Sequence, residues 1–119
     1  MTAPLFHITN IAQHEKSLEA LVRIDANHRI FAGHFPGRPV VPGVCQLELT
    51  ENIVSQFLQL PIQVFEVVSA KYVAPINPVE TPEITVKLNM EHNDAATTFS
   101  GTISAGEQVF CRLKCRAKA

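Results

Sequence analysis

The sequence predicts an α+β fold, in which an antiparallel sheet is covered by one long helix. Apolar and polar residues alternate with a period of two over residues 18–25 and through most of 62–118, which indicates strands. The segment between Pro42 and Pro61 instead carries apolar residues on more than one helical stripe, which is typical of a helix buried on several sides. Successive strands joined by short turns favour antiparallel pairing, so the helix must cover the inner face of the sheet.

The elements follow from these patterns in chain order. We expect a first strand from Leu5 to about Ile11, a strand over 18–25, a short edge at Ile30–Phe31, a helix over 43–60, a long strand over 62–73, and strands over 84–91, 97–103 and 109–116. The strand over 62–73 is apolar on both faces, so we expect both faces to be covered. Asn93-Asp94 and Ala105-Gly106-Glu107 supply turns between the last three strands.

Composition narrows the class of protein. The 119 residues form one domain over 1–119, and 46% apolar residues suit a globular core. The net charge of −1 gives no electrostatic case for binding nucleic acid. No apolar run reaches the length of a membrane span, and the N-terminus lacks the basic and apolar regions of a signal peptide. We therefore expect a cytoplasmic protein that is not inserted in a membrane.

Three cysteines form neither an even disulfide set nor a metal-binding motif, so no metal site is predicted. We interpret Cys45, Cys111 and Cys115 as small buried hydrophobic residues. A nucleophilic Cys45 is the alternative, because a helix start can lower the pKa of a thiol. Four histidines lie in polar or turn settings and are expected at the solvated surface: His7, His14, His28 and His92.

One stretch rich in proline and glycine leads into the helix and carries the candidate chemistry. It reads Gly33-His34-Phe35-Pro36-Gly37-Arg38-Pro39-Val40-Val41-Pro42-Gly43-Val44-Cys45-Gln46-Leu47-Glu48. A helix start carries unpaired N–H groups, so the Gly43 amide can polarise an acyl carbonyl. His34 can take a proton near neutral pH. Glu48 lies roughly 7–8 Å further along the helix axis and can address another atom of the ligand. These groups suit a β-elimination beside a thioester.

The same residues carry a resemblance to a known family. His34-Phe35-Pro36-Gly37-x-Pro39-x-x-Pro42-Gly43, with an acidic residue five positions later, resembles the signature of the hot-dog-fold 3-hydroxyacyl-[acyl-carrier-protein] dehydratases of the FabZ and FabA type. Residues 70–78 also resemble the family's second strand and its proline-containing turn. The resemblance implies a hot-dog fold and a dimer or higher homo-oligomer. It implies that His34 is the catalytic base, that Glu48 comes from the other subunit, and that the Gly43 amide binds the thioester carbonyl. We expect Phe35, Pro42 and Val44 to contact the substrate as well.

Several residues depart from the family pattern or lie outside it. Gln46 replaces a usual aliphatic residue, Glu51 adds a charge that we expect near the site, and Asn52 stands where glutamine is common. The row Arg112, Lys114, Arg116 and Lys118 is either a solvated strand face that discourages edge pairing or a landing surface for an acidic carrier protein. Arg38, beside the motif, is a second candidate for carrier contact.

The resulting hypothesis is a (3R)-hydroxyacyl-[acyl-carrier-protein] dehydratase that forms a trans-2-enoyl thioester in fatty-acid or specialised lipid or polyene biosynthesis. Its expected partner is acyl carrier protein bearing a 3-hydroxyacyl chain, and no cofactor is required. Glu48 acts either as proton donor or by orienting His34 or water, since a helix start lowers a carboxyl pKa and apolar surroundings raise it. The alternatives are a hot-dog thioesterase, in which Glu48 or His34 activates water, and a non-catalytic acyl-binding subunit that pairs with an active homologue.

Overall fold

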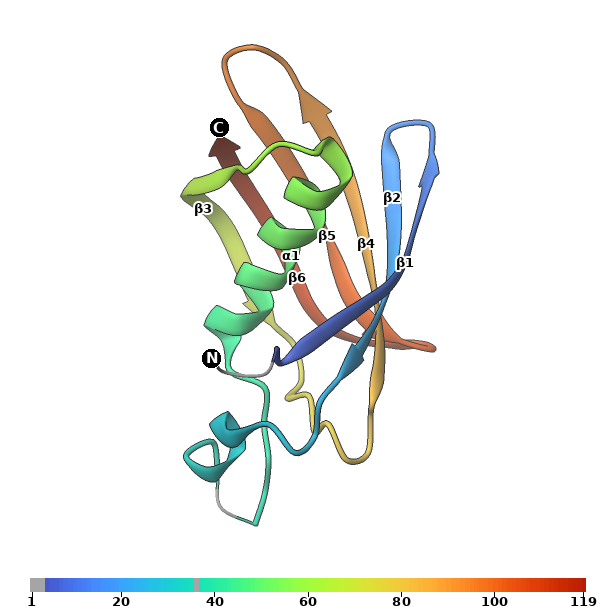
Figure 1. Ribbon diagram of the computed structural model, residues 1–119, viewed down its shortest axis with the longest axis vertical. Helices are drawn as coiled ribbons and strands as arrows, with labels where there is room; N and C mark the ends of the chain where they lie inside the picture. The colour runs from blue at the N-terminus through green and yellow to red at the C-terminus, as the bar shows by residue number, and fades with distance from the viewer. Residues whose placement is uncertain (1–3, 36) are drawn as a thin grey trace.

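The computed structural model describes residues 4–35 and 37–119. In chain order the elements are β1 (Phe6–His14), β2 (Ser17–Ile24), a 3₁₀ helix η1 (Arg29–Ala32), α1 (Gly43–Leu58), β3 (Gln63–Tyr72), β4 (Glu83–His92), β5 (Thr97–Ala105) and β6 (Gln108–Lys118) (Figure 1). All pairs of neighbouring strands are antiparallel, and the described strands form one sheet in the order β1-β2-β4-β5-β6-β3.

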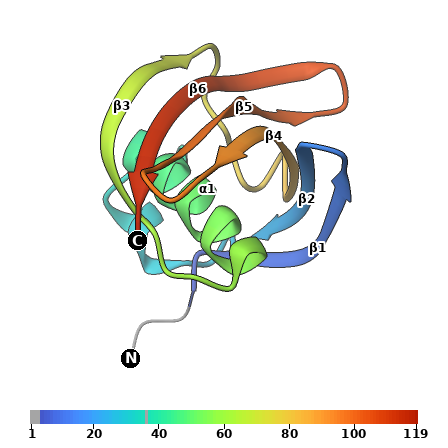
Figure 2. The same cartoon turned by 90° about the horizontal axis from the view of Figure 1, so that it is seen from above.

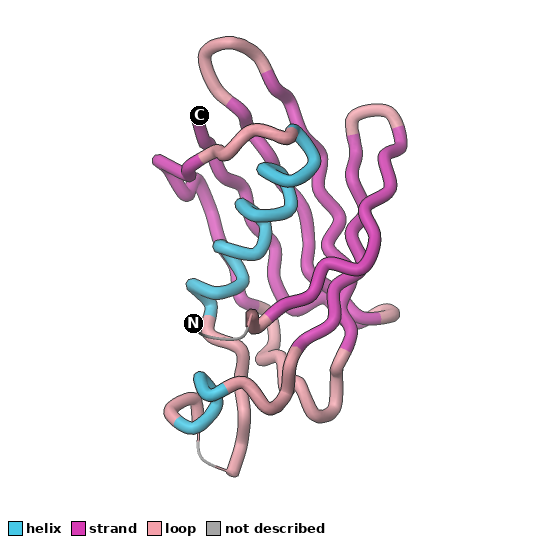
Figure 3. Tube along the Cα trace, viewed as in Figure 1, coloured by secondary structure: helices cyan, strands magenta, loops and turns pink. Residues whose placement is uncertain are grey.

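The sheet curls around α1, which runs along its concave face (Figure 2). Strand β3 lies at one edge of this curl and β1 at the other, and the tube view shows the long loop before α1 at one end of the molecule (Figure 3). This arrangement confirms the predicted α+β fold, in which an antiparallel sheet wraps one long helix. The alternation in the sequence anticipated it because a sheet with one apolar face needs a second layer to cover that face.

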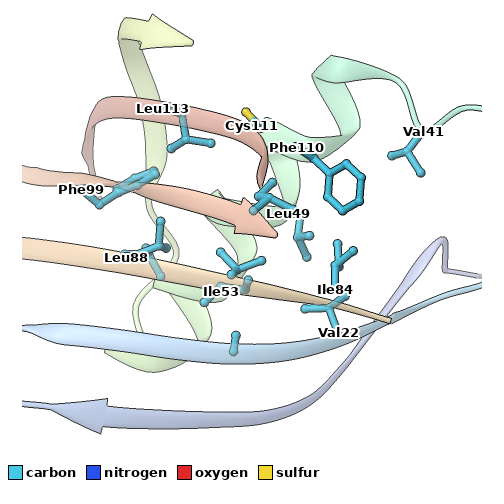
Figure 4. Close-up of a cluster of buried hydrophobic side chains, with 14 of the residues drawn as sticks. Val22, Val41, Leu49, Ile53, Ile84, Leu88, Phe99, Phe110, Cys111 and Leu113 are labelled. Carbon is cyan, nitrogen blue, oxygen red and sulfur yellow. The ribbon is translucent and has the colours of Figure 1, made fainter. Parts of the chain in front are cut away.

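The core lies between α1 and the inner faces of the central strands (Figure 4). Buried positions alternate with half-buried or exposed ones along β2, β4 and β6, as the period-two pattern predicted. The fully or nearly fully buried strand residues include Leu18, Ala20, Val22, Ile84, Val86, Leu88, Phe99, Ile103, Cys111, Leu113, Cys115 and Ala117. The helix contributes Leu49, Ile53 and Val54 to the same cluster.

Helix α1 begins at Gly43 as predicted and ends at Leu58, two residues before the predicted end at Leu60. The chain turns at Gln59, which adopts a left-handed conformation with φ of 54°. Only one face of the helix is buried, namely Gln46, Leu49, Thr50, Ile53 and Val54. Val44 is 62% exposed, so the expectation of a helix buried on several sides is wrong for this chain by itself. Among the described residues, no helix is both long and apolar enough to cross a membrane.

Two polar helix residues hold the start of β3. The Glu51 carboxylate accepts a hydrogen bond from the backbone N–H of Val64 at 2.8 Å. The Ser55 hydroxyl accepts one from the N–H of Ile62 at 3.1 Å. Glu51 therefore attaches the helix to the sheet edge, which gives this departure from the family pattern a structural role.

Strand β3 itself is almost entirely exposed, against the expectation that both of its faces are covered. It pairs only with β6 and lies at the sheet edge. Its large apolar residues include Phe65 at 48% and Val67 at 45% exposure. The pattern correctly indicated an apolar strand, but one copy of the chain supplies no layer to cover it.

The segment before the motif forms η1 rather than the expected short strand edge at Ile30–Phe31. His28 stands directly before this helix, and its ring Nδ1 accepts a hydrogen bond from the N–H of Ile30 at 3.0 Å. This local cap favours a helical turn over extended pairing. Phe31 packs into the core from this turn.

Candidate active site

The loop that carries His34 is ordered by its own backbone hydrogen bonds. The His34 N–H donates to the carbonyl of Ile30 at 3.2 Å, and the His34 carbonyl accepts from the N–H of Val40 at 2.9 Å. Phe35 and Arg38 exchange two further backbone hydrogen bonds, at 3.1 and 2.9 Å. The His34 side chain is exposed, and its ring centroid lies 5.2 Å from that of Phe35. The loop thus presents the imidazole on a fixed backbone.

Behind this loop, Val41 anchors the chain to the body of the protein. Its side chain is buried beside the core, and its N–H donates to the carbonyl of Ile76 at 3.0 Å (Figure 4). Gln46 is also buried, and its side-chain amide donates to the Val41 carbonyl at 3.4 Å. The other amide atom, Gln46 Oε1, is buried and has no hydrogen-bond partner among the described residues. Gln46 therefore faces inward and supports the segment that precedes the helix.

The start of α1 offers backbone donors to a ligand. Pro42 is the residue before the helix, and its side chain has no group that can cap the first N–H groups. Its carbonyl accepts from the N–H groups of Cys45 and Gln46, at 3.1 and 3.3 Å. The first amide of the helix, that of Gly43, points out of the N-terminus together with the positive end of the helix dipole. A developing oxyanion is stabilised by this kind of environment.

Tyr72 from β3 explains why residue 43 is a glycine. Its hydroxyl donates a hydrogen bond to the Gly43 carbonyl at 3.0 Å. A Cβ atom at Gly43 would lie only 2.7 Å from Cζ of the Tyr72 ring, so a side chain there would displace the ring. Sequence reasoning did not identify Tyr72 as a site residue. Its strand period indicated only which face of β3 it occupies.

Glu48 lines a cavity of about 330 Å³ between the helix, η1 and the N-terminal strand. The lining consists of Pro4, Leu5, Phe6, His28, Ile30, Cys45, Glu48, Leu49 and Asn52. His34 is not among these residues. The structure therefore places Glu48 at a cavity and His34 on an exposed loop, and it does not bring the two side chains to one cavity within one chain.

Cys45 also lines this cavity. Burial raises its pKa above the ordinary value of 9.0, and the nearby Glu48 carboxylate raises it further. Both effects keep the thiol protonated at neutral pH. Since the thiolate is the nucleophilic form, this environment disfavours the alternative in which Cys45 is a nucleophile.

The predicted substrate-contacting residues and the predicted carrier-contacting residues lie in different places. Phe35 is 54% exposed on the motif loop, Pro42 is half-buried, and Val44 is exposed on the first turn of α1. These three residues flank His34 and Gly43 in the chain. Arg38 is also exposed on the motif loop.

Arg112, Lys114 and Arg116 occupy the opposite side of the sheet. They alternate along β6 with buried residues of the core, so they face away from α1. Arg116 forms a salt bridge with Glu66 at 3.0 Å and lies 5.3 Å from the centroid of the Phe65 ring. The structure does not gather these residues with Arg38 into one basic surface.

Comparison with known proteins agrees with this fold. A 3-hydroxyacyl-[acyl-carrier-protein] dehydratase FabZ from Haemophilus influenzae is 29% identical over 105 residues, which cover 82% of this chain and 70% of that protein. The corresponding FabZ from Mannheimia succiniciproducens is 30% identical over 105 residues, with 82% and 69% covered. In structure, the dehydratase heterocomplex ApeI:P from Xenorhabdus doucetiae gives a TM-score of 0.74 at 19% identity and covers 95% of this chain and 97% of the matched chain.

The helix wrapped by an antiparallel sheet, together with the sequence similarity to dehydratases, places the protein in the dehydratase class with the hot-dog fold. Within this class, the family model of the ApeI-like proteins, described as ApeI dehydratase, matches residues 10–113, and the chain belongs to that family.

Proposed function

We propose that this protein is a (3R)-3-hydroxyacyl-[acyl-carrier-protein] dehydratase, which removes water from a 3-hydroxyacyl thioester to leave a trans-2-enoyl thioester. The observation that carries the proposal is the start of α1. There an uncapped Gly43 amide follows the ordered His34 loop and precedes Glu48 on the same helix. Membership of a dehydratase family supports the same reaction.

Each group has a defined part in the proposed elimination. His34 removes the α-proton, and the electron pair of the broken Cα–H bond forms the new double bond as the bond from C3 to the hydroxyl oxygen breaks. The Gly43 N–H holds the negative charge that develops on the thioester oxygen. Glu48 faces the 3-hydroxyl and assists its departure as water, either by giving it a proton or by orienting it.

Enoyl-thioester hydration or the reverse dehydration, followed by ultraviolet absorbance, tests this function. We expect turnover by the parent protein, and a loss of about 100-fold or more in His34→Ala because a general base is removed. Glu48→Gln keeps a hydrogen-bonding side chain but has no acidic proton, so its remaining rate separates proton donation from orientation. Release of free thiol instead of enoyl product would assign the protein as a thioesterase.

We propose further that the complete site forms between two copies of the chain. Within one chain, His34 lies outside the cavity that Glu48 lines. The β3 edge offers exposed apolar residues, and Val44 on the first turn of α1 is exposed as well. Pairing of two β3 edges would extend the sheet and cover these residues. We propose that the His34 of one chain meets the Glu48 of the other in this dimer, and two-fold symmetry then gives two equivalent sites.

Mixing two inactive variants tests the shared site. His34→Ala and Glu48→Gln chains are unfolded together and refolded to exchange subunits. A shared site predicts recovery of about one quarter of the parent activity, since half of the dimers are mixed and one of their two sites is intact. Sites contained within single chains predict no recovery, and the two variants refolded separately are the control.

A different hot-dog chain is the alternative occupant of the β3 edge. The structurally similar ApeI:P assembly is described as a heterocomplex. If the protein is a monomer, binds acyl carrier protein and turns over no substrate, this subunit role replaces the proposed enzyme. Sedimentation equilibrium of the purified chain gives the required mass.

For carrier recognition we propose Arg38, because it shares the motif loop with His34. Arg38→Ala should raise the KM for a carrier-bound substrate more than that for a pantetheine thioester, since electrostatic steering acts on the charged carrier. Arg112→Ala with Lys114→Ala is the matched control, because these residues lie on the far face of the sheet. An equal effect of Arg38→Ala on both substrates would remove it from the carrier surface.

A further inference from the structure

His28 is positioned to act on the same ligand as Glu48. The sequence indicated a solvated turn residue, whereas the structure makes His28 half-buried and places this residue in the lining of the Glu48 cavity. It comes from the segment before η1, and Glu48 comes from α1, so two separate elements bring them to one cavity of about 330 Å³.

The hydrogen bond at Nδ1 determines which form of the ring faces the cavity. Nδ1 of His28 accepts from the Ile30 N–H at 3.0 Å, and a nitrogen that accepts carries no proton. The proton of the neutral ring therefore resides on Nε2, which acts as a donor. With Nδ1 engaged by the backbone, the ring nitrogen that His28 can offer to a ligand is the donor Nε2–H.

The remaining lining of the cavity suits an acyl chain with one oxygen near its start. Leu5, Phe6, Ile30 and Leu49 supply apolar contacts, whereas Glu48 and Asn52 lie about one turn apart on α1. A thioester held at the Gly43 amide would extend along the helix toward Glu48, and its C3 oxygen would enter this polar part of the cavity. His28 is the lining residue outside the helix that can donate to that oxygen from another side.

We infer that His28 contacts the substrate, donating its Nε2–H to the 3-hydroxyl oxygen, and so favours 3-hydroxyacyl thioesters over saturated ones. This inference rests on the proposed function for the identity of the ligand. It assigns to His28 a role in recognition, separate from the proton transfers of His34 and Glu48. The oxygen keeps this hydrogen bond as the bond to C3 breaks and the hydroxyl leaves as water.

Binding of two pantetheine thioesters tests the inference without turnover. Calorimetry is carried out in the His34→Ala background, so that 3-hydroxyhexanoyl pantetheine is not consumed, and hexanoyl pantetheine is the matched ligand without the hydroxyl. Adding His28→Asn keeps a cap for η1, because the asparagine oxygen can replace Nδ1, but removes the distal donor. We expect 3-hydroxyhexanoyl binding to weaken by about three- to tenfold, with hexanoyl binding unchanged.

Two further variants complete the design. His28→Gln places an amide nitrogen near the position of Nε2, so it should restore part of the selectivity even though the cap is weakened. His7→Asn, at an exposed position of β1 outside the cavity, should change neither affinity. Equal weakening of both ligands by His28→Asn, or no weakening of either, would overturn the inference.

The test remains separate from that of the proposed function. Turnover by the parent together with unchanged selectivity in His28→Asn would refute the role of His28 and leave the dehydratase assignment standing. Selectivity that depends on His28 in a protein without turnover would support the contact and refute the enzyme.

Discussion

Strands β4 and β3 are both rich in apolar residues, but they differ in how far those residues are buried. In β4, Ile84, Val86 and Leu88 are buried and alternate with polar residues that are exposed or half-buried. In β3, Phe65 and Val67 remain about half exposed. The difference is one of position, because β4 has a strand on each side and the helix over its inner face, whereas β3 has one neighbouring strand. An apolar sequence pattern therefore predicts a strand suited to burial, but it does not predict whether the same chain or another molecule buries it.

The sharpest test of this comparison removes a phenyl ring from each region. Phe99→Ala, in the fully buried core, should lower the free energy of unfolding by about 3–5 kcal/mol. Phe65→Ala, on β3, should cost about 1 kcal/mol or less at high dilution, where only its contact with Arg116 and Lys118 is lost. Urea unfolding at several protein concentrations provides both values. A large loss for Phe65→Ala that does not vary with concentration would contradict the assignment of β3 as an interface.

A charge on β3 should break assembly without breaking the fold. Val67→Asp places a carboxylate among the apolar residues of the open edge, and we expect association to weaken by at least about tenfold, or about 1.4 kcal/mol. Sedimentation equilibrium measures the change. Asn89→Asp, at an exposed position of β4, is the control and should leave association unaltered. If Val67→Asp keeps the parent mass, the copies do not pair through β3.

Tyr72 connects the exposed strand β3 to the helix start at Gly43. Removing its hydroxyl should therefore lower the free energy of unfolding only modestly. Tyr72→Phe keeps the ring against Gly43 but removes the 3.0 Å hydrogen bond to its carbonyl. We expect a loss of about 0.5–1.5 kcal/mol in the free energy of unfolding. A thermal or urea melt measures this loss. Gly43→Ala should be more damaging than Tyr72→Phe, because its Cβ would meet the ring, and combining it with Tyr72→Ala should recover part of the lost stability. No recovery would mean that the ring is not what restricts residue 43.

The smallest effect concerns the thiols of β6 that lie in the core. Burial raises the pKa of both Cys111 and Cys115 above the ordinary value of 9.0. The unfolded chain releases these protons as pH rises through 9, whereas the folded chain retains them, so stability must fall with rising pH. The loss between pH 7 and 9 is at most about 0.4 kcal/mol per thiol, the limit for a folded thiol that does not ionise in this range. Urea unfolding across this range should show a flatter profile for Cys111→Ala with Cys115→Ala, although that variant is less stable throughout. An identical slope in both proteins would contradict the burial of the thiols.

The central strands and the helix start were predictable because their signals are local. Period-two alternation fixed the inward positions of β2, β4 and β6, and Pro42-Gly43 marked the first turn of α1. The helix at η1 was not predicted, because it depends on a side-chain cap by His28 that a short apolar pair does not reveal. The pairing of β3 with β6 depends on contacts between distant parts of the chain, which local periodicity cannot report.

The candidate site likewise has a part that local sequence signals predicted and a part that depends on long-range packing. The spacing of His34, Gly43 and Glu48 places each on a loop or helix whose course the sequence predicted. The residues that share a cavity with Glu48 are determined by how η1 and the N-terminal strand pack against α1. This packing places His28 in that cavity, which the sequence did not predict. Glu51 was expected near the site, but its hydrogen bond to Val64 is an attachment to the sheet edge.

Because β3 pairs with the last strand of the chain, its partner is synthesised after every other element of the sheet. Gln63 pairs with Lys118 and Tyr72 with Cys111, so β3 leaves the ribosome well before β6, its neighbour in the sheet, has been made. During that interval, both of its hydrogen-bonding edges and its apolar residues are open to other chains. Crowding on a polysome would then favour misassembly at this strand, and a chaperone that binds nascent chains would find in residues 63–72 an extended apolar segment to protect.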